Sequence, residues 1–322
     1  MLAYFSSLSP IALLNSCPGG VAQGLIWGIM ALGVYLTFRV LNVADLTVDG
    51  SLATGGAVCI MLVLNGVNPQ VALLVSFVSG LLAGLITGFL HTVLGIPDIL
   101  AGILTQISLY SINLNIMGKA NQSVNVNKVS FLFTSNAKLL VRTIGLVALV
   151  CVALIALLYW YLGTETGSAI RATGTNPNMS RAQGINTNLM KVVGLALSNG
   201  LVALSGGILA QYQGFADVNM GRGAIVIGLA AVIIGEVLGE AIIGKRLNMA
   251  LRLLCVVIGG IIYYIVYVFV LWLKFPADDM KLLTAIVVAI FLAVPYLKGK
   301  YFTRSYAVKY MTRSMRKKKE EN

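Results

Sequence analysis

The sequence predicts an all-helical protein that crosses a membrane many times, and three observations lead to this fold class. Of the 322 residues, 58% are hydrophobic and only 11% are charged, and the mean hydropathy is +0.89. A soluble domain carries about 25% charged residues, so this chain has too few to cover a surface in water. The apolar runs are long enough for helical spans, and they lack the alternation of membrane β-strands.

Apolar runs follow one another along almost the whole chain. We expect about eight to ten membrane-spanning or half-membrane helices, from runs at 20–38, 51–65, 69–94, 98–117, 139–162, 189–212, 223–239, 249–273 and 281–297. The runs 51–65 and 223–239 are short and rich in glycine, which is typical of half-helices or tilted segments. The chain is therefore interpreted as one transmembrane domain, 1–297, followed by a basic tail, 298–322.

The tail predicts the orientation of the chain. Much of the net charge of +12 lies in Lys and Arg residues that directly follow the last apolar run, as is typical of a cytoplasmic segment beside anionic lipid. This placement argues against nucleic acid as a partner. Counting backwards places 163–191 inside the cell, and 117–138 and 214–222 outside. The stretch 117–142 is about as basic as 163–191, so the predicted orientation rests mainly on the tail.

The most informative polar segment, 164–190, predicts a short helix on the cytoplasmic side. Asn176 is a good N-cap residue and Pro177 suits the first helical position. Gly184 suits the left-handed residue that ends a helix, which gives a helix of about two turns. A short, rigid, exposed helix suits docking to another protein. An ordinary connecting helix on the membrane surface is the alternative.

This segment also carries a resemblance. The coupling loop of the branched-chain amino acid and ribose type of ABC permeases resembles Gly167-(x)3-Arg171-Ala-(x)-Gly174-(x)-Asn176-(x)5-Ala182-(x)-Gly184-Ile185-Asn186. A subgroup of that family, linked to tryptophan- and tyrosine-type uptake, resembles three further stretches: Ala44–Ser51, Leu100–Thr105 and Ala203–Asp217. The similarity covers roughly residues 20–297.

The resemblance implies the permease subunit of a type II ABC importer for a small solute. Its coupling loop would dock on a separate cytoplasmic ATPase through Arg171, Asn176, Pro177, Arg181 and Gly184. It also implies a second copy of the chain, with a heterodimer left open, an extracytoplasmic solute-binding protein (a lipoprotein), and a bacterial plasma membrane. An amino acid is the expected solute, an aromatic one first, with a sugar or a nucleoside as alternatives.

Polar residues inside the apolar runs mark a candidate path for the solute. In the run 98–117 they occupy two neighbouring helical faces, and polar side chains are costly against lipid. The alternative is hydrogen bonding between packed helices, which the small residues around position 199 favour. The expected path residues are Thr105, Gln106, Ser108, Tyr110, Asn113, Asn199, Asp45, Asp49 and Asp217.

Two stretches with related patterns raise the hypothesis of an inverted repeat. Ala44–Ser51 and Ala216–Gly223 both begin with Ala-Asp and continue through an aliphatic, a polar and an apolar residue toward glycine. The first is expected near the inside and the second near the outside, as in inverted repeats with interrupted helices. The alternative role of Asp45 and Asp49 is to cap the next helix, with Arg39 neutralising Asp45.

Other motifs argue against an enzyme. Gly239–Arg246 comes close to a P-loop, but Arg246 replaces the Ser or Thr that should hold Mg²⁺. We therefore expect ATP and Mg²⁺ on a separate ATPase and no cofactor on this chain. His91 is the only histidine, so no His-based metal site is expected. The remaining rivals are a channel and an ion-coupled secondary transporter, which would need ionisable groups at mid-membrane.

Overall fold

The computed structural model describes residues 10–124, 131–135, 139–244 and 248–273, with single helical positions between 282 and 293. The chain divides into compact units Met1–Lys274 and Phe275–Asn322, and every feature below belongs to the first. The predicted run 281–297 lies largely outside the described residues. The predicted basic tail 298–322 lies wholly outside them.

The predicted helical membrane protein is confirmed. Within the described part of the chain, seven helices are long and apolar enough to cross a membrane. In chain order, the long helices are α2 (Pro10–Tyr35), α3 (Val48–Leu64), α4 (Pro69–Thr92), α5 (Asp98–Met117), α6 (Leu140–Gly163), α9 (Thr187–Gln213), α10 (Ala224–Ile243) and α11 (Met249–Trp272). Of these, α3 is too short to count as a span, as its run indicates, whereas α10 is longer than predicted.

A π-helix follows α2 without a break. This element, η1 (Leu36–Leu41), ends at Asn42, which adopts a left-handed conformation (φ 55°), a conformation that asparagine tolerates better than most residues. The backbone N–H groups of Asn42 and Val43 both donate to the carbonyl of Thr37. The chain then turns back into the protein to begin α3. Sequence periodicity does not predict this element, and π-helical turns are frequent at functional sites.

The long helix α9 lies at the centre of the packing, against α2, α3 and α4. Small residues let the backbones approach closely, as is typical of membrane helices. At Gly80 of α4, an added Cβ would overlap the main-chain carbonyl of Asn199 in α9. The α3–α4–α9 core is therefore held by direct backbone contact, while α10 and α11 pack beside it against α2.

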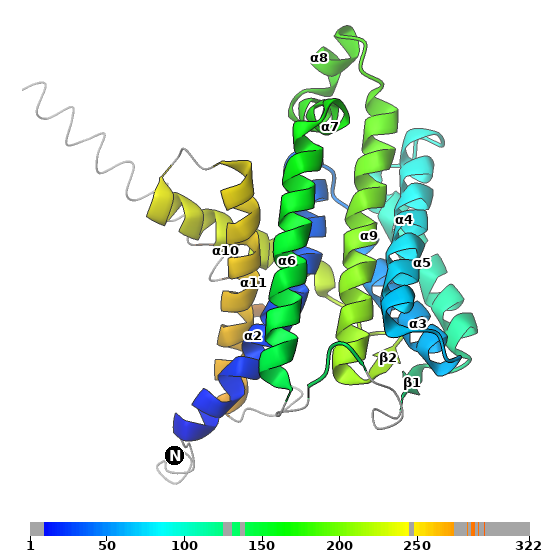
Figure 1. Ribbon diagram of the computed structural model, residues 1–322. Helices are drawn as coiled ribbons and strands as arrows, with labels where there is room; N and C mark the ends of the chain where they lie inside the picture. The colour runs from blue at the N-terminus through cyan, green and yellow to red at the C-terminus, as the bar shows by residue number, and fades with distance from the viewer. Residues whose placement is uncertain are drawn as a thin grey trace, which may run out of the picture. The chain divides into compact units, whose positions relative to one another are not determined.

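The polar connections gather at opposite ends of the helices (Figure 1). One end carries α7 (Glu165–Thr175) and α8 (Pro177–Ala182). The other carries the strands β1 (Asn121–Ser123) and β2 (Phe215–Asp217), which pair antiparallel with Asn121 opposite Asp217. This arrangement agrees with the prediction that 163–191 lies on the opposite side of the membrane from 117–138 and 214–222; which side is inside stays a prediction.

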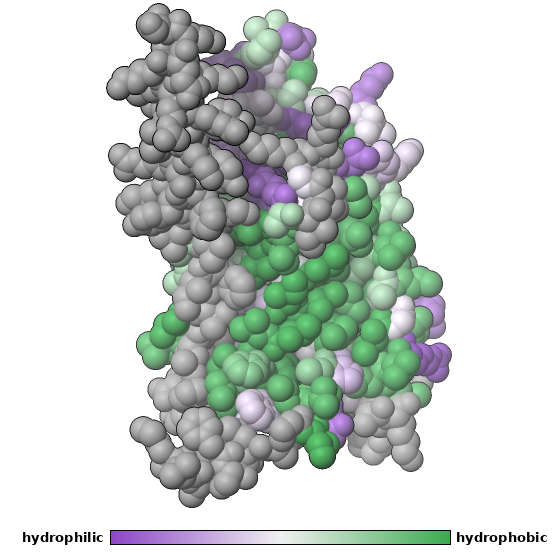
Figure 2. Space-filling model, turned by 90° about the vertical axis from the view of Figure 1, so that its left-hand side faces the viewer, coloured by the Kyte–Doolittle hydropathy of each residue, from purple (hydrophilic) through white to green (hydrophobic). Residues whose placement is uncertain are grey.

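The surface has the distribution expected for a protein in a bilayer. Figure 2 shows a broad belt of hydrophobic residues across the middle of one face, with hydrophilic residues gathered toward the α7–α8 end. Large apolar side chains are exposed on several helices, among them Leu74 on α4 and Val152 on α6. Such exposure is costly in water and favourable against hydrocarbon.

Candidate functional site

A cavity of about 240 Å³ lies where the start of α3, the middle of α5 and the segment before α10 meet. It is smaller than the roughly 300–1,000 Å³ of sites for drug-sized ligands, and its size suits a small solute. The lining residues are Asp49, Gly50, Ala53, Gln106, Ile107, Tyr110, Asn113, Val218, Asn219 and Arg222.

Asp49 connects two helix starts at this cavity. It lies in the first turn of α3, yet its carboxylate accepts backbone N–H groups from the start of α10: Gly223 donates to Oδ2 and Ile225 to Oδ1, both at 2.9 Å. The first N–H groups of a helix have no partner within that helix, and the helix dipole favours negative charge there. Asp49 therefore caps α10, whereas the sequence suggested capping of its own helix.

Asn113 has an unusual environment within the cavity wall. The residue is 0% exposed, and neither Oδ1 nor Nδ2 of its side chain has a hydrogen-bond partner among the described residues. Leaving a buried polar group unpaired costs about 1–3 kcal/mol. Since Asn113 lines the cavity, the cavity is where a partner for its amide would lie.

Two further side chains give the cavity its chemical character. Tyr110 is 43% exposed and lines the cavity from α5. Arg222 lines it from the segment before α10, and its guanidinium takes part in no hydrogen bond or ion pair found in the described part of the chain. With Asp49, the cavity thus combines a cation, an anion, amides and an aromatic ring.

Other expected path residues lie in a buried hydrogen-bond network. Asp45 is 3% exposed, and its Oδ2 accepts a hydrogen bond from Nδ2 of Asn199 at 2.7 Å. Ser51 donates to Oδ1 of Asn199 at 2.6 Å. Thr105 accepts a hydrogen bond from Thr87 at 2.9 Å. These groups join α3, α4, α5 and α9, and none of them lines the cavity.

Ser108 and Asp217 also lie away from the cavity lining. Ser108 is exposed on α5, and its hydroxyl donates to the Leu104 carbonyl of the same helix. Asp217 in β2 accepts hydrogen bonds from the side chain of Asn121 and from the backbone N–H of Asn219. It therefore fixes the strand pair and the turn that follows. Of the expected path residues, the structure gathers Asp49, Gln106, Tyr110 and Asn113 at one site.

Sequence reasoning missed Arg222 and Asn219. Both were placed in a loop outside the membrane, because they precede the apolar run 223–239. The segment instead turns inward, and Gly221 packs directly on the main chain of Asp49. The available signal was a cation between two glycines at the start of an apolar run.

At the α7–α8 end of the protein, the capped helix predicted between Asn176 and Gly184 is confirmed, but it is shorter than predicted. α8 has six residues, and the side chain of Asn176 accepts the backbone N–H of Met179 at 3.1 Å. Gly184 has the left-handed conformation expected of it (φ 82°). The preceding helix α7 was not predicted. Gly167 and Gly174 lie inside it, and glycine is unfavourable in helices.

The expected ATPase-facing residues have different surroundings. Asn176 and Pro177 are exposed at the start of α8. Arg181 donates from Nε to the Thr187 hydroxyl at 2.8 Å, which ties α8 to the start of α9. Arg171 is exposed and lines a hollow of about 560 Å³ between α6, α7 and the start of α11, together with Thr164.

The loop end is in direct contact with η1. At Gly174 of α7, an added Cβ would overlap the main-chain carbonyl of Val40 in η1. Any larger residue would therefore separate α7 from the π-helix. Because η1 leads directly to the turn that contains Asp45, the polar loop and the buried network are joined by continuous packing.

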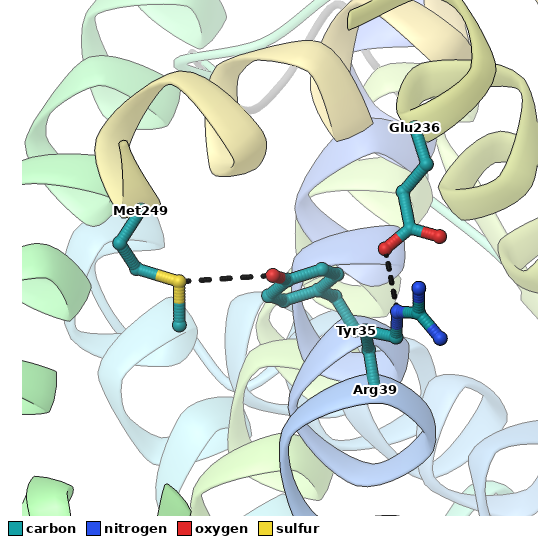
Figure 3. A network of polar contacts seen from close by, with 4 residues as sticks. All are labelled: Tyr35, Arg39, Glu236 and Met249. Atoms are coloured by element: carbon teal, nitrogen blue, oxygen red, sulfur yellow. Dashed lines mark hydrogen bonds and ion pairs between the residues drawn. The ribbon is translucent and has the colours of Figure 1, made fainter. Parts of the chain in front are cut away.

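η1 is also tied to α10, and the end of α2 is tied to α11 (Figure 3). Nε of Arg39 lies 2.7 Å from Oε1 of Glu236 in α10. The Tyr35 hydroxyl donates to Sδ of Met249 at the start of α11. The suggested pairing of Arg39 with Asp45 is therefore replaced by a pairing with Glu236, since the turn after Asn42 carries Asp45 to α9.

Comparison with known families covers most of the chain. The family model for the permease component of the branched-chain amino acid transport system matches residues 18–294, which include the cavity and the α7–α8 loop. This chain belongs to that permease family. Like the family, it is a multi-pass membrane protein and the permease component of an ABC transport system.

Individual proteins resemble the chain to different degrees. The tyrosine transport system permease protein of Clostridioides difficile (strain R20291) is 39% identical over 273 residues, 85% of this chain and 89% of that protein. The ribose import permease of Escherichia coli (strain K12) is 28% identical over 212 residues, 63% of each chain. Among solved structures, PsaBC from Streptococcus pneumoniae in complex with Fab aligns with a TM-score of 0.49 and 16% identity, covering 91% of this chain and 94% of that one.

Proposed function

We propose that this chain moves an amino acid, an aromatic one in the first place, across a bacterial plasma membrane as part of an ATP-driven importer. The similarity to the tyrosine permease carries this proposal, because 39% identity extends over 85% of the chain. The ribose permease is less similar and matches a smaller share. A sugar is therefore the second candidate, with a nucleoside behind it.

The driving ATPase would be a separate protein that docks on α8. This helix is capped, exposed and polar, and Met179 in it is 61% exposed. Arg171 would pair with acidic groups of the ATPase, which raises the association rate and fixes the register of docking. ATP and Mg²⁺ would bind to that ATPase and no cofactor to this chain, in which Arg246 replaces the P-loop Ser or Thr.

Movement at α8 would reach the cavity through packed elements. α7 contacts η1 through Gly174, and η1 leads to the turn with Asp45. Asp45 is bonded to Asn199, which also holds Ser51 at the start of α3. Asp49 in the same turn of α3 forms part of the cavity wall. Such a chain of rigid helices and buried hydrogen bonds can carry a displacement from one site to another.

Two further partners complete the importer. A second copy of the chain would cover α5, where Ser111 is exposed beside Ile107; exposed polar groups are costly against lipid. A solute-binding lipoprotein would deliver solute at the β1–β2 end. The basic tail 298–322 would lie on the cytoplasmic side.

Uptake of radiolabelled tyrosine into proteoliposomes tests this function. The vesicles contain the permease with or without its ATPase, with ATP on the ATPase side and binding protein on the opposite side. We expect uptake only with ATPase and ATP, and no uptake with an ATPase variant that cannot hydrolyse ATP. Uptake driven by a proton or sodium gradient alone would instead identify a secondary transporter, and passive equilibration a channel.

A further inference from the structure

We infer that the cavity between α3, α5 and the start of α10 binds the zwitterion of a free α-amino acid. Arg222 holds its carboxylate, and Asp49 and Asn113 hold its ammonium group. This inference rests on the proposed amino-acid transport and makes it specific, because it assigns each charge of the solute to a named side chain.

The carboxylate end is assigned from Arg222. A guanidinium presents parallel N–H donors that match the two oxygens of a carboxylate. The side chain is exposed toward the cavity and has no hydrogen-bond or ion-pair partner within the described ranges. Its backbone N–H donates to the Asn219 carbonyl at 3.0 Å, which fixes the turn that carries it. An anionic group in the cavity would supply the missing partner.

The ammonium end is assigned from Asp49 and Asn113. Each carboxylate oxygen of Asp49 accepts one N–H from the start of α10, and a carboxylate oxygen can accept a second hydrogen bond. Oδ1 of Asn113 is fully buried and accepts none from the residues described. An ammonium group carries three donors, enough for both residues.

The opposite charges favour an amino acid over a sugar. A sugar has hydroxyl groups that could bond to the amides, but it has no anion to match Arg222. A zwitterion satisfies the arginine, the carboxylate and the buried amide together. The exposed ring of Tyr110 adds a surface on which an aromatic solute can pack, since aromatic pairs gain from offset or edge-to-face contact.

Equilibrium binding to the full-length permease in lipid nanodiscs tests the carboxylate assignment. The probes are radiolabelled L-tyrosine and tyramine, which lacks the carboxylate. We expect the wild type to prefer tyrosine by about tenfold or more, one good hydrogen bond being worth about a factor of ten. Arg222→Gln should abolish this preference, and Arg222→Lys should restore part of it.

Arg142→Gln serves as the control, because Arg142 is an exposed arginine near the start of α6 that does not line the cavity. It should leave the preference unchanged. An Arg222→Gln variant that still prefers tyrosine overturns the proposal, and so does a wild type without saturable tyrosine binding.

Asn113→Leu tests the ammonium end. The substitution keeps a similar volume and removes an unpaired buried amide, so thermal stability should hold or rise. Tyrosine binding should nevertheless fall about tenfold. Unchanged binding would show that Asn113 only packs between helices and would overturn its role.

Uptake assays separate this inference from the proposed function. If ATP-driven tyrosine uptake is undiminished in Arg222→Gln, the proposed binding site is wrong, while the proposed transport function still stands. If the wild type shows no ATP-driven uptake of amino acids, the proposed function itself is wrong.

Discussion

The starts of α3 and α10 meet beside the same cavity, but different kinds of contact hold them in place. Before α3, Asp45 is buried and is fixed by Asn199 and by the backbone N–H of Thr47. Before α10, Gly223 is left-handed (φ 84°), and no side chain of its own segment caps the helix. Its N–H groups depend on Asp49, which belongs to α3.

This difference indicates which start can move. The start of α3 is joined to α4, α5 and α9 by a chain of buried hydrogen bonds, so displacing it requires the core to rearrange. The N–H groups of Gly223 and Ile225 at the start of α10 are held by the single carboxylate of Asp49, at the edge of a cavity that Arg222 also lines. A solute that draws the Asp49 side chain away would therefore free the N–H groups of Gly223 and Ile225 while the start of α3 stays in place.

Asn199→Leu should have the largest effect on stability, because it removes the hydrogen bonds that hold the start of α3. The substitution leaves the buried groups of Asp45 and Ser51 without their partner, and we expect a loss of about 3 kcal/mol in the free energy of unfolding. Thermal denaturation in detergent measures the change. Asn188→Leu on the exposed side of α9 is the control and should have little effect. Equal stability of the two variants would show that the network does not hold α3.

Gly174→Ala should have the next largest effect on stability, since the Cβ of the new alanine would overlap the Val40 carbonyl. Forcing α7 away from η1 costs about 1–3 kcal/mol, as overpacking does elsewhere. We expect ATP hydrolysis to continue while tyrosine uptake falls, because the loop no longer moves the α3 start. Gly163→Ala is the control, as a Cβ at Gly163 meets open space. Normal uptake by Gly174→Ala would exclude this contact from coupling.

Asp49→Ala tests whether the starts of α3 and α10 are held independently, since it removes the cap of α10 and leaves the hydrogen bonds of Asp45 in place. Loss of an N-cap interaction costs about 1 kcal/mol. Hydrogen exchange at the amides of Gly223 and Ile225 should become faster, while exchange around Ser51 stays slow. Asp217→Ala, which alters the nearby strand pair, should not reproduce this pattern. Faster exchange at both helix starts would show that they are not held independently.

The sequence was sufficient to predict the long helices, because a segment that crosses hydrocarbon must be a long apolar run whose backbone groups bond within the helix. From 51 to 273 the predicted runs match the described helices closely, whereas α2 begins at Pro10, well before the predicted start at 20. The capping of α8 followed from local rules at Asn176 and Gly184. η1 and the strands β1 and β2 were not predicted. Their formation depends on contacts between distant segments, such as the pairing of Asn121 with Asp217.

The site was only partly predictable for the same reason. The helical faces of α5 identified Gln106, Tyr110 and Asn113 as polar residues within a span. Spacing could not distinguish them from Thr105, whose hydroxyl is bonded to Thr87 across two helices. Arg222 reaches the cavity because the segment after β2 turns back into the protein. The glycines on either side of Arg222 allow a turn, but its direction depends on the contact of Gly221 with the distant main chain of Asp49.

Arg39→Gln should have the smallest effect on stability. Arg39 is half exposed, with 51% of its side-chain surface accessible, and exposed ion pairs are worth about 0–1 kcal/mol. A double-mutant cycle with Glu236→Gln should give a coupling energy in that range. A contact this weak can break in each transport cycle, so it can join η1 to the movable helix α10 without locking it. A coupling energy of about 3 kcal/mol or more, typical of buried pairs, would instead show that α10 is as firmly held as α3.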